Sequence, residues 1–109
     1  MNAIDNLTND KGRVNASSNK QEGSYTNTHE SGKKYHGKGD ETRAQKSATE
    51  KAKANNDPVK KTDWKPSANS RQAYKDESRR LQQDGGHRNP NNYNKRDSPG
   101  TKYRKQDGE

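Results

Sequence analysis

Apolar side chains are sparse along this chain, and only two stretches give them the spacing of a helix. In residues 41–55, alanines recur at positions 44, 48 and 52, which makes a narrow stripe of small residues. Asp40 or Thr42 can cap the start of this helix, and the run Asn55-Asn56-Asp57-Pro58 stops it. An alanine stripe buries little apolar area, so the pattern predicts only a marginal helix near 41–55.

A second marginal helix is predicted near 70–84. Ser70 can cap its start, Gly85-Gly86 ends it, and Tyr74 and Leu81 lie along one side. The same two side chains raise the possibility of a segment that folds into the groove of a larger partner. Two anchors are few for that mode of binding.

No sustained period organises the rest of the chain, so composition sets the segments. Residues 1–32 are interpreted as a polar flexible tail, and residues 33–61 as a basic segment that contains the first helix. Residues 62–84 form a mixed-charge segment with the second helix. Residues 85–109 are rich in glycine, proline and asparagine and are expected to form a basic coil tail.

The apolar content argues against a packed core. Hydrophobic residues make up 18% of the 109, phenylalanine is absent, and the branched aliphatic side chains are Ile4, Leu7, Val14, Val59 and Leu81. Ordering each residue costs roughly 1–2 kcal/mol of backbone entropy, whereas burial of one large apolar side chain returns about 1.5–3 kcal/mol. We therefore expect an intrinsically disordered, monomeric chain without a packed core.

Metal and cofactor sites are not expected. The chain has no cysteine, and His29, His36 and His87 are too scattered to form a zinc site. "SGKKYHGKGDET" (31–42) has Gly32, Gly37 and Lys38 at phosphate-loop spacing, but Gly39 stands where the pattern requires serine or threonine. The preceding "GSYTNTHE" is polar and has nothing to bury, so we expect no strand before the loop and no nucleotide site.

Enzyme activity is not expected either. A catalytic acid or base needs a perturbed pKa, which needs burial, and the composition predicts that nothing is buried. The chain has no 18-residue apolar run and no basic and apolar leader at its start, so no transmembrane segment or signal peptide is expected. The expected location is cytoplasmic, or nuclear if the source is a eukaryote.

Two features resemble stress-protection proteins. The mean hydropathy of −1.98 and the nine glycines resemble those of hydrophilins. "TRAQKSATEKAKA" (42–54) is similar to the eleven-residue repeats of the group-3 late-embryogenesis-abundant (LEA) family, although it occurs here once. The resemblance implies a disordered stress protectant that gains helix on drying, contributes to desiccation tolerance, and acts through bulk hydration and molecular shielding.

The alternative is a basic disordered protein that binds nucleic acid or associates with ribosomes or chromatin. The net charge is +8 and the isoelectric point is about 9.7. Such binding, to nucleic acid or to another anionic surface, would come from counterion release and aromatic stacking and would lack specificity. The fifteen interspersed acidic residues would weaken it, and no specific small-molecule partner is expected. The side chains expected to contact nucleic acid are Lys33, Lys34, Lys38, Lys60, Lys61, Trp64, Tyr74, Arg79, Arg80, Lys95, Arg96, Lys102, Tyr103, Arg104 and Lys105.

Overall fold

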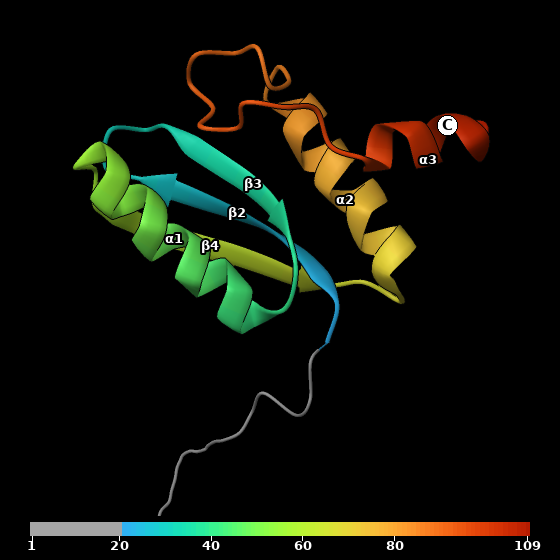
Figure 1. The fold of residues 1–109 in the computed structure, drawn as a ribbon, viewed down its shortest axis with the longest axis horizontal. Coiled ribbons are helices and arrows are strands. Elements are labelled where there is room, and N and C mark those ends of the chain that lie inside the picture. Colours follow the sequence, from blue (N-terminus) through green and yellow to red (C-terminus); the bar gives the residue numbers. More distant parts are fainter. Residues whose placement is uncertain (1–20) are drawn as a thin grey trace, which may run out of the picture.

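Three polar strands form an antiparallel sheet at the centre of the protein. The structure is a computed structural model and describes residues 21–109. The strand order is β3-β2-β4, so that β2 is paired on both sides. In chain order the elements are β2 (Gly23–His29), β3 (Lys34–Lys38), α1 (Glu41–Asn55), β4 (Val59–Pro66), α2 (Ser70–Gln83) and α3 (Gly100–Gln106) (Figure 1).

The central strand buries one face through polar and aromatic side chains. Tyr25, Asn27 and His29 alternate along β2, and each is at most 1% exposed. Tyr25 is paired with Gly37 on β3 and with Trp64 on β4. The alternation has the two-residue period of a strand, but the buried members are not the aliphatic residues usual in that position.

Helix α1 packs on this face through small side chains. Its buried residues are Ala44, Ser47 and Ala48, so the helix backbone can approach the strands closely. The amide of Asn27 bridges the layers: Nδ2 donates to the Ala44 carbonyl at 3.0 Å, and Oδ1 accepts from the Thr62 hydroxyl of β4 at 2.7 Å. Both polar ends of the buried Asn27 amide therefore keep a hydrogen-bond partner.

Helix ends are fixed by side-chain caps. The Asp40 carboxylate accepts from the Arg43 backbone N–H and caps α1, as the sequence allowed. Helix α1 ends at Asn56, which adopts the left-handed conformation with φ of 49°. Asn69, and not Ser70, caps α2 by accepting from the Gln72 backbone N–H.

Helix α2 contacts the other face of the sheet, and α3 packs on α2 (Figure 1). Arg80 on α2 donates to the hydroxyls of Ser24 and Thr26 at 2.8 and 2.9 Å. The buried Lys75 holds α3 through an ion pair of 2.7 Å with Asp107. Helix α3 lies inside the segment that was expected to be coil.

The loop between α2 and α3 returns to the free edge of β3 (Figure 1). Lys34 donates its backbone N–H to the Asn91 carbonyl and accepts from the Tyr93 N–H. The Asn94 side chain both accepts from the His36 N–H at 2.9 Å and donates to the His36 carbonyl at 2.8 Å. These bonds satisfy the strand edge and place residues 93–99 beside α2.

The expectation of intrinsic disorder without a core is wrong. The two expected helices lie close to the expected residues, but they are packed against a sheet and not marginal. The disorder prediction considered only large apolar side chains as sources of stability. The buried residues also include alanines and hydrogen-bonded polar residues beside Tyr25. Of the expected tail at residues 1–32, residues 1–20 lie outside the described part and Gly23–His29 forms β2.

Within residues 21–109, every helix is too short or too polar to cross a membrane.

We predict that Asn27→Ala lowers the free energy of unfolding by about 2–3 kcal/mol, because the change leaves the Ala44 carbonyl and the Thr62 hydroxyl without their partner. Urea denaturation followed by circular dichroism measures this. The control is Asn55→Ala at an exposed position near the end of α1. A cooperative wild-type transition with equal midpoints for both variants would contradict the bridging role of Asn27.

Candidate functional site

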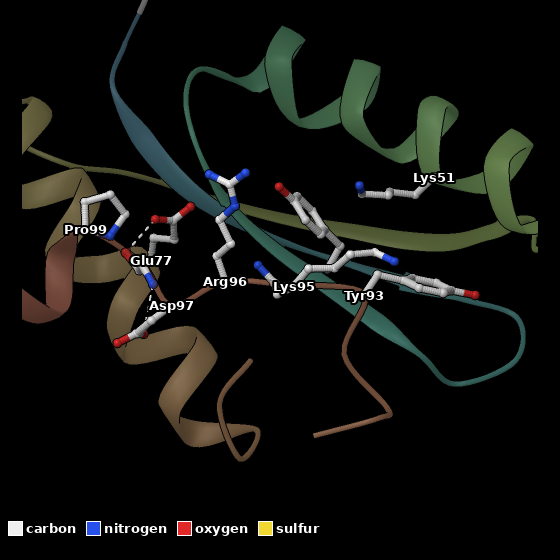
Figure 2. Close-up of a pocket in the computed structure, with 10 residues that line it drawn as sticks. Lys51, Glu77, Tyr93, Lys95, Arg96, Asp97 and Pro99 are labelled. Carbon is white, nitrogen blue, oxygen red and sulfur yellow. Dashed lines mark hydrogen bonds between the residues drawn. The ribbon is translucent and has the colours of Figure 1, made fainter. Parts of the chain in front are cut away.

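A pocket of about 280 Å³ opens between β3, α1, α2 and the loop that follows α2. Figure 2 shows side chains from these elements converging on it. Strand β3 contributes Tyr35, α1 contributes Lys51 and α2 contributes Glu77. The remaining wall is the continuous stretch 93–99, which the Asn94 bonds hold against β3.

Three cationic side chains line the pocket. The Lys51 ammonium lies 4.7 Å from the centre of the Tyr35 ring. Lys95 and Arg96 come from the loop and are exposed, and Figure 2 shows both with Lys51 around the opening. The lining therefore offers positive charge to an anionic group.

Glu77 is one of the two acidic side chains that line the pocket. The other acid of the lining, Asp97, accepts through Oδ1 from the Ser98 backbone N–H and from the Thr101 hydroxyl, and so caps the approach to α3. Glu77 Oε1 accepts from the Ser98 hydroxyl at 2.6 Å. Glu77 Oε2 is not among the buried side-chain atoms that lack a hydrogen-bond partner in residues 21–109, so water can reach this oxygen.

Burial raises the pKa of Glu77 above its ordinary value, although the Ser98 hydrogen bond and the Lys38 charge oppose the rise. Burial therefore disfavours the charged form of this carboxyl group, and a nearby positive charge favours it. The sequence argument against catalysis assumed that nothing is buried. That assumption is wrong, because Glu77, Tyr25 and Tyr35 all have pKa values raised mainly by burial.

Two tyrosines stand together beneath the pocket. The ring centres of Tyr25 and Tyr35 are 6.4 Å apart, and burial raises the pKa of both hydroxyls, with Arg43 opposing the rise. Since an ordinary tyrosine pKa is already near 10, both hydroxyls stay protonated at neutral pH. The Tyr35 hydroxyl can thus donate a hydrogen bond to an anion in the pocket.

Glycine at position 37 makes room for the Tyr25 ring. A Cβ atom at Gly37 would overlap the Cζ and Oη atoms of Tyr25, which crosses β3 at this point. Residues 35–37 ("YHG") thus supply a tyrosine of the pocket lining, a buried histidine, and the glycine that leaves room for the Tyr25 ring.

Asp57 ties the loop wall to the β2–β3 turn. Its carboxylate accepts from the Ser31 hydroxyl and from the Tyr93 hydroxyl, both at 2.6 Å. These hydrogen bonds hold the pKa of Asp57 below its ordinary value. The Tyr93 ring also packs edge-on against the buried His29, with ring centres 5.3 Å apart. Tyr93 is therefore a fixed part of the pocket wall.

Of the side chains expected to contact nucleic acid, only Lys95 and Arg96 line this pocket. Lys34, Lys61 and Arg80 line a separate hollow on the opposite face of the sheet, where Asp63 and Asp84 offset their charge. The remaining predicted residues are dispersed. Arg79 and Arg104 form ion pairs with Glu109, and the Trp64 indole donates to the Gly39 carbonyl. Three residues make cation–π contacts: Lys38 with Tyr74, Lys33 with Tyr93, and Tyr103 with Arg71. The last three, Lys60, Lys102 and Lys105, are exposed.

His29 and His36 are not surface histidines in coil. Both are at most 1% exposed. Nδ1 of His36 is 2.9 Å from the Thr26 hydroxyl, and Nε2 is 2.8 Å from Asp84 without the alignment of a hydrogen bond. Residues 21–109 contain no group of three or more histidine and acidic side chains arranged to hold a metal ion.

The "SGKKYHGKGDET" stretch is not coil. The expectation that "GSYTNTHE" forms no strand is wrong, because these residues supply β2. Gly37 and Lys38 belong to β3, and a turn separates the two strands, so this part of the motif pairs with β2 and does not wrap around a phosphate.

Sequence reasoning missed the side chains that build the pocket from different elements. Tyr35, Tyr93 and Lys51 were not among the residues expected to contact a ligand. Glu77 carries no local signal, because its position beside Tyr35 depends on how α2 packs. Recognition of β2 and β3 as a hairpin could have placed Tyr25 and Tyr35 together.

The chain matches no family model, no curated protein and no solved structure, so its function is inferred from this geometry.

We predict that Gly37→Ala destabilises the fold by about 1–3 kcal/mol, because the added methyl group displaces the Tyr25 ring. The measurement is a double-mutant cycle with Tyr25→Ala in urea denaturation. The cost of Gly37→Ala should fall by more than half in the Tyr25→Ala background. Equal costs in both backgrounds would show that the ring is not the obstacle.

Acid should weaken the Asp57 link. A carboxyl group with a lowered pKa in the folded state contributes stability above its unfolded pKa of about 3.9, and that contribution is lost as the pH falls through the folded value. The difference in Tm between wild type and Asp57→Asn should therefore be largest at about pH 6 and shrink toward about pH 2. Glu30→Gln, at an exposed position, is the control. A difference that is constant with pH would contradict this account.

Proposed function

We propose that the pocket binds a phosphodiester of nucleic acid and hydrolyses it with the help of a divalent cation. The observation that carries this proposal is the lining of one pocket, in which the Glu77 carboxyl group lies with Tyr35 and three cationic side chains. A phosphate needs hydrogen-bond donors and cations, and a metal ion needs a carboxylate oxygen. The pocket lining contains both kinds of group.

The phosphate would lie between α1 and the loop. Lys51, Lys95 and Arg96 offset its charge, and the protonated Tyr35 hydroxyl donates to one of its oxygens. Hydrolysis forms a bond from a water oxygen to phosphorus and breaks the bond from phosphorus to one sugar oxygen, which takes up the proton that the water loses. Donors that are fixed beforehand stabilise the negative charge on the non-bridging oxygens in the transition state.

Glu77 would hold the divalent cation through Oε2. Mg²⁺ is commonly bound by one or two carboxylates, with waters and substrate phosphate oxygens completing its shell. A single protein carboxylate is therefore a sufficient anchor once substrate is present. The bound cation supplies charge stabilisation at the reacting phosphate.

The surroundings of the pocket support a polymeric substrate. The chain carries a net charge of +8, and exposed lysines such as Lys46 on α1 lie outside the pocket, where a small phosphate ester would not reach them. An extended polyanion gains from dispersed positive charge through counterion release. These features support the nucleic-acid alternative over a bulk-hydration role, which makes no use of the compact fold.

We predict that the wild-type protein cleaves labelled DNA or RNA, single- or double-stranded, in Mg²⁺ or Mn²⁺, and that excess EDTA abolishes cleavage. Glu77→Gln should reduce the rate at least about 100-fold, because the neutral amide cannot hold the cation, while nucleic-acid binding changes little. Denaturing gels measure cleavage, and fluorescence anisotropy in EDTA measures binding.

Two comparisons make the test specific. Glu30→Gln, a carboxylate on the exposed turn between β2 and β3, should retain the wild-type rate. Absence of cleavage on all four substrates with both metals would overturn the proposal. Equal rates for Glu77→Gln and wild type would also overturn it, because the activity would then come from elsewhere.

A further inference from the structure

The side chain of Asn94 takes the place of a neighbouring strand residue at the edge of β3. Its Oδ1 accepts from the His36 backbone N–H at 2.9 Å, and its Nδ2 donates to the His36 carbonyl at 2.8 Å. One amide thus satisfies both backbone groups of one residue, as the facing residues of an antiparallel pair do. Because both ends of the amide are bonded, the main chain at Asn94 has a defined position and direction beside β3.

The loop is anchored a second time at Ser98. The Ser98 hydroxyl donates to Glu77 Oε1 of α2 at 2.6 Å, and Ser98 is 7% exposed. Lys95 and Arg96 lie between this anchor and Asn94. Few backbone conformations join two fixed points across so short a span, so the backbone positions of both residues are restricted.

The side chains of this span are the two cations that the loop contributes to the pocket. Both are exposed, and Figure 2 shows them between Tyr93 and Asp97. A cationic side chain on a mobile backbone loses backbone and rotamer freedom when it binds an anion. A backbone that is already fixed leaves only the rotamer cost, which favours binding. The third cation, Lys51, comes from α1 and does not depend on the loop.

We propose that Asn94 is a positioning residue, which holds the backbone of Lys95 and Arg96 where their side chains contact a phosphate of nucleic acid. The inference rests on the anion-binding part of the proposed function, and it requires neither cleavage nor a metal ion. It predicts a coupling: the contribution of Lys95 and Arg96 to affinity depends on Asn94, whereas the contribution of Lys51 does not.

The test is a double-mutant cycle for binding. Fluorescence anisotropy with labelled single-stranded DNA and RNA oligonucleotides, in EDTA at one fixed salt concentration, gives the Kd. With Asn94 in place, the joint change of Lys95→Ala and Arg96→Ala should raise the Kd about 10-fold or more, because two charge-assisted contacts are lost. In the Asn94→Ala background the same joint change should raise the Kd about threefold or less, because the cations are no longer held in place.

Two controls separate positioning from a general loss of stability. Lys51→Ala should raise the Kd by the same factor with and without Asn94, because α1 carries Lys51. Asn92 is 8% exposed and donates to the Gly86 carbonyl at 2.8 Å in the same loop, but it does not line the pocket. In the Asn92→Ala background the joint change should keep its full effect.

Circular dichroism establishes that each variant is folded. If Asn94→Ala does not fold, Asn94→Ser replaces the amide by a single hydroxyl, which cannot make both bonds to His36 with the same geometry. The effect of the joint change should then fall in the same direction, and an unreduced effect in folded Asn94→Ser would contradict the positioning role.

The outcomes separate this inference from the proposed function. The expected coupling without cleavage by the wild type would overturn the proposed hydrolysis and support the role of Asn94. Glu77-dependent cleavage, together with an equal effect of the joint change in both backgrounds, would overturn the inference alone. An equal loss of the Lys51→Ala effect would also overturn it, because Asn94→Ala would then act on the whole pocket. Absence of binding to both oligonucleotides by the wild type would overturn both.

Discussion

A single buried amide joins three of the elements of this protein, and the sheet depends on groups of that kind being satisfied. Asn27 is fully buried at the centre of β2, donates to the Ala44 carbonyl of α1 and accepts from Thr62 of β4. Unpaired, such a group would cost about 1–3 kcal/mol, so the layers are held in one register by the need to keep these partners. An aliphatic core tolerates small shifts, whereas this one requires particular distances and angles.

The site follows from that constraint. The register of β2 against β3 places Tyr25 opposite Gly37, and the Tyr25 ring lies across β3 at this position. Only a glycine there leaves room for the ring. Tyr35 then faces α1 and Lys51. The loop wall is fixed by similar polar bonds, in which Asn94 satisfies the edge of β3 and Asp57 holds Tyr93. Cationic and acidic groups from distant parts of the sequence are thereby kept around one small volume.

The helices could be predicted from the sequence, but the sheet and most of the site could not. Helix ends are local: Asp40 caps α1 through a residue three positions away, and Asn56 to Pro58 end it. The strands have the right two-residue alternation in "SYTNTH", but their inward side chains are tyrosine, asparagine and histidine, which an apolar count treats as surface. Lys95 and Arg96 could be named from charge alone. Glu77 could not, since its pocket position depends on the packing of α2 and on the return of the loop.

The failure of the disorder prediction has a specific physical cause. The estimate treated polar residues as contributing nothing to folding, which holds when they remain in water. Here Tyr25 contributes a large buried ring, and Ala44 and Ala48 allow the helix backbone to lie close to the strands. Close approach then puts polar groups within bonding distance, so that their desolvation is offset by charge-assisted and amide hydrogen bonds. A chain of similar composition that does not pack small residues against aromatic and amide side chains lacks these stabilising contacts. The arrangement of polar residues, and not their abundance, therefore decides whether such a sequence folds.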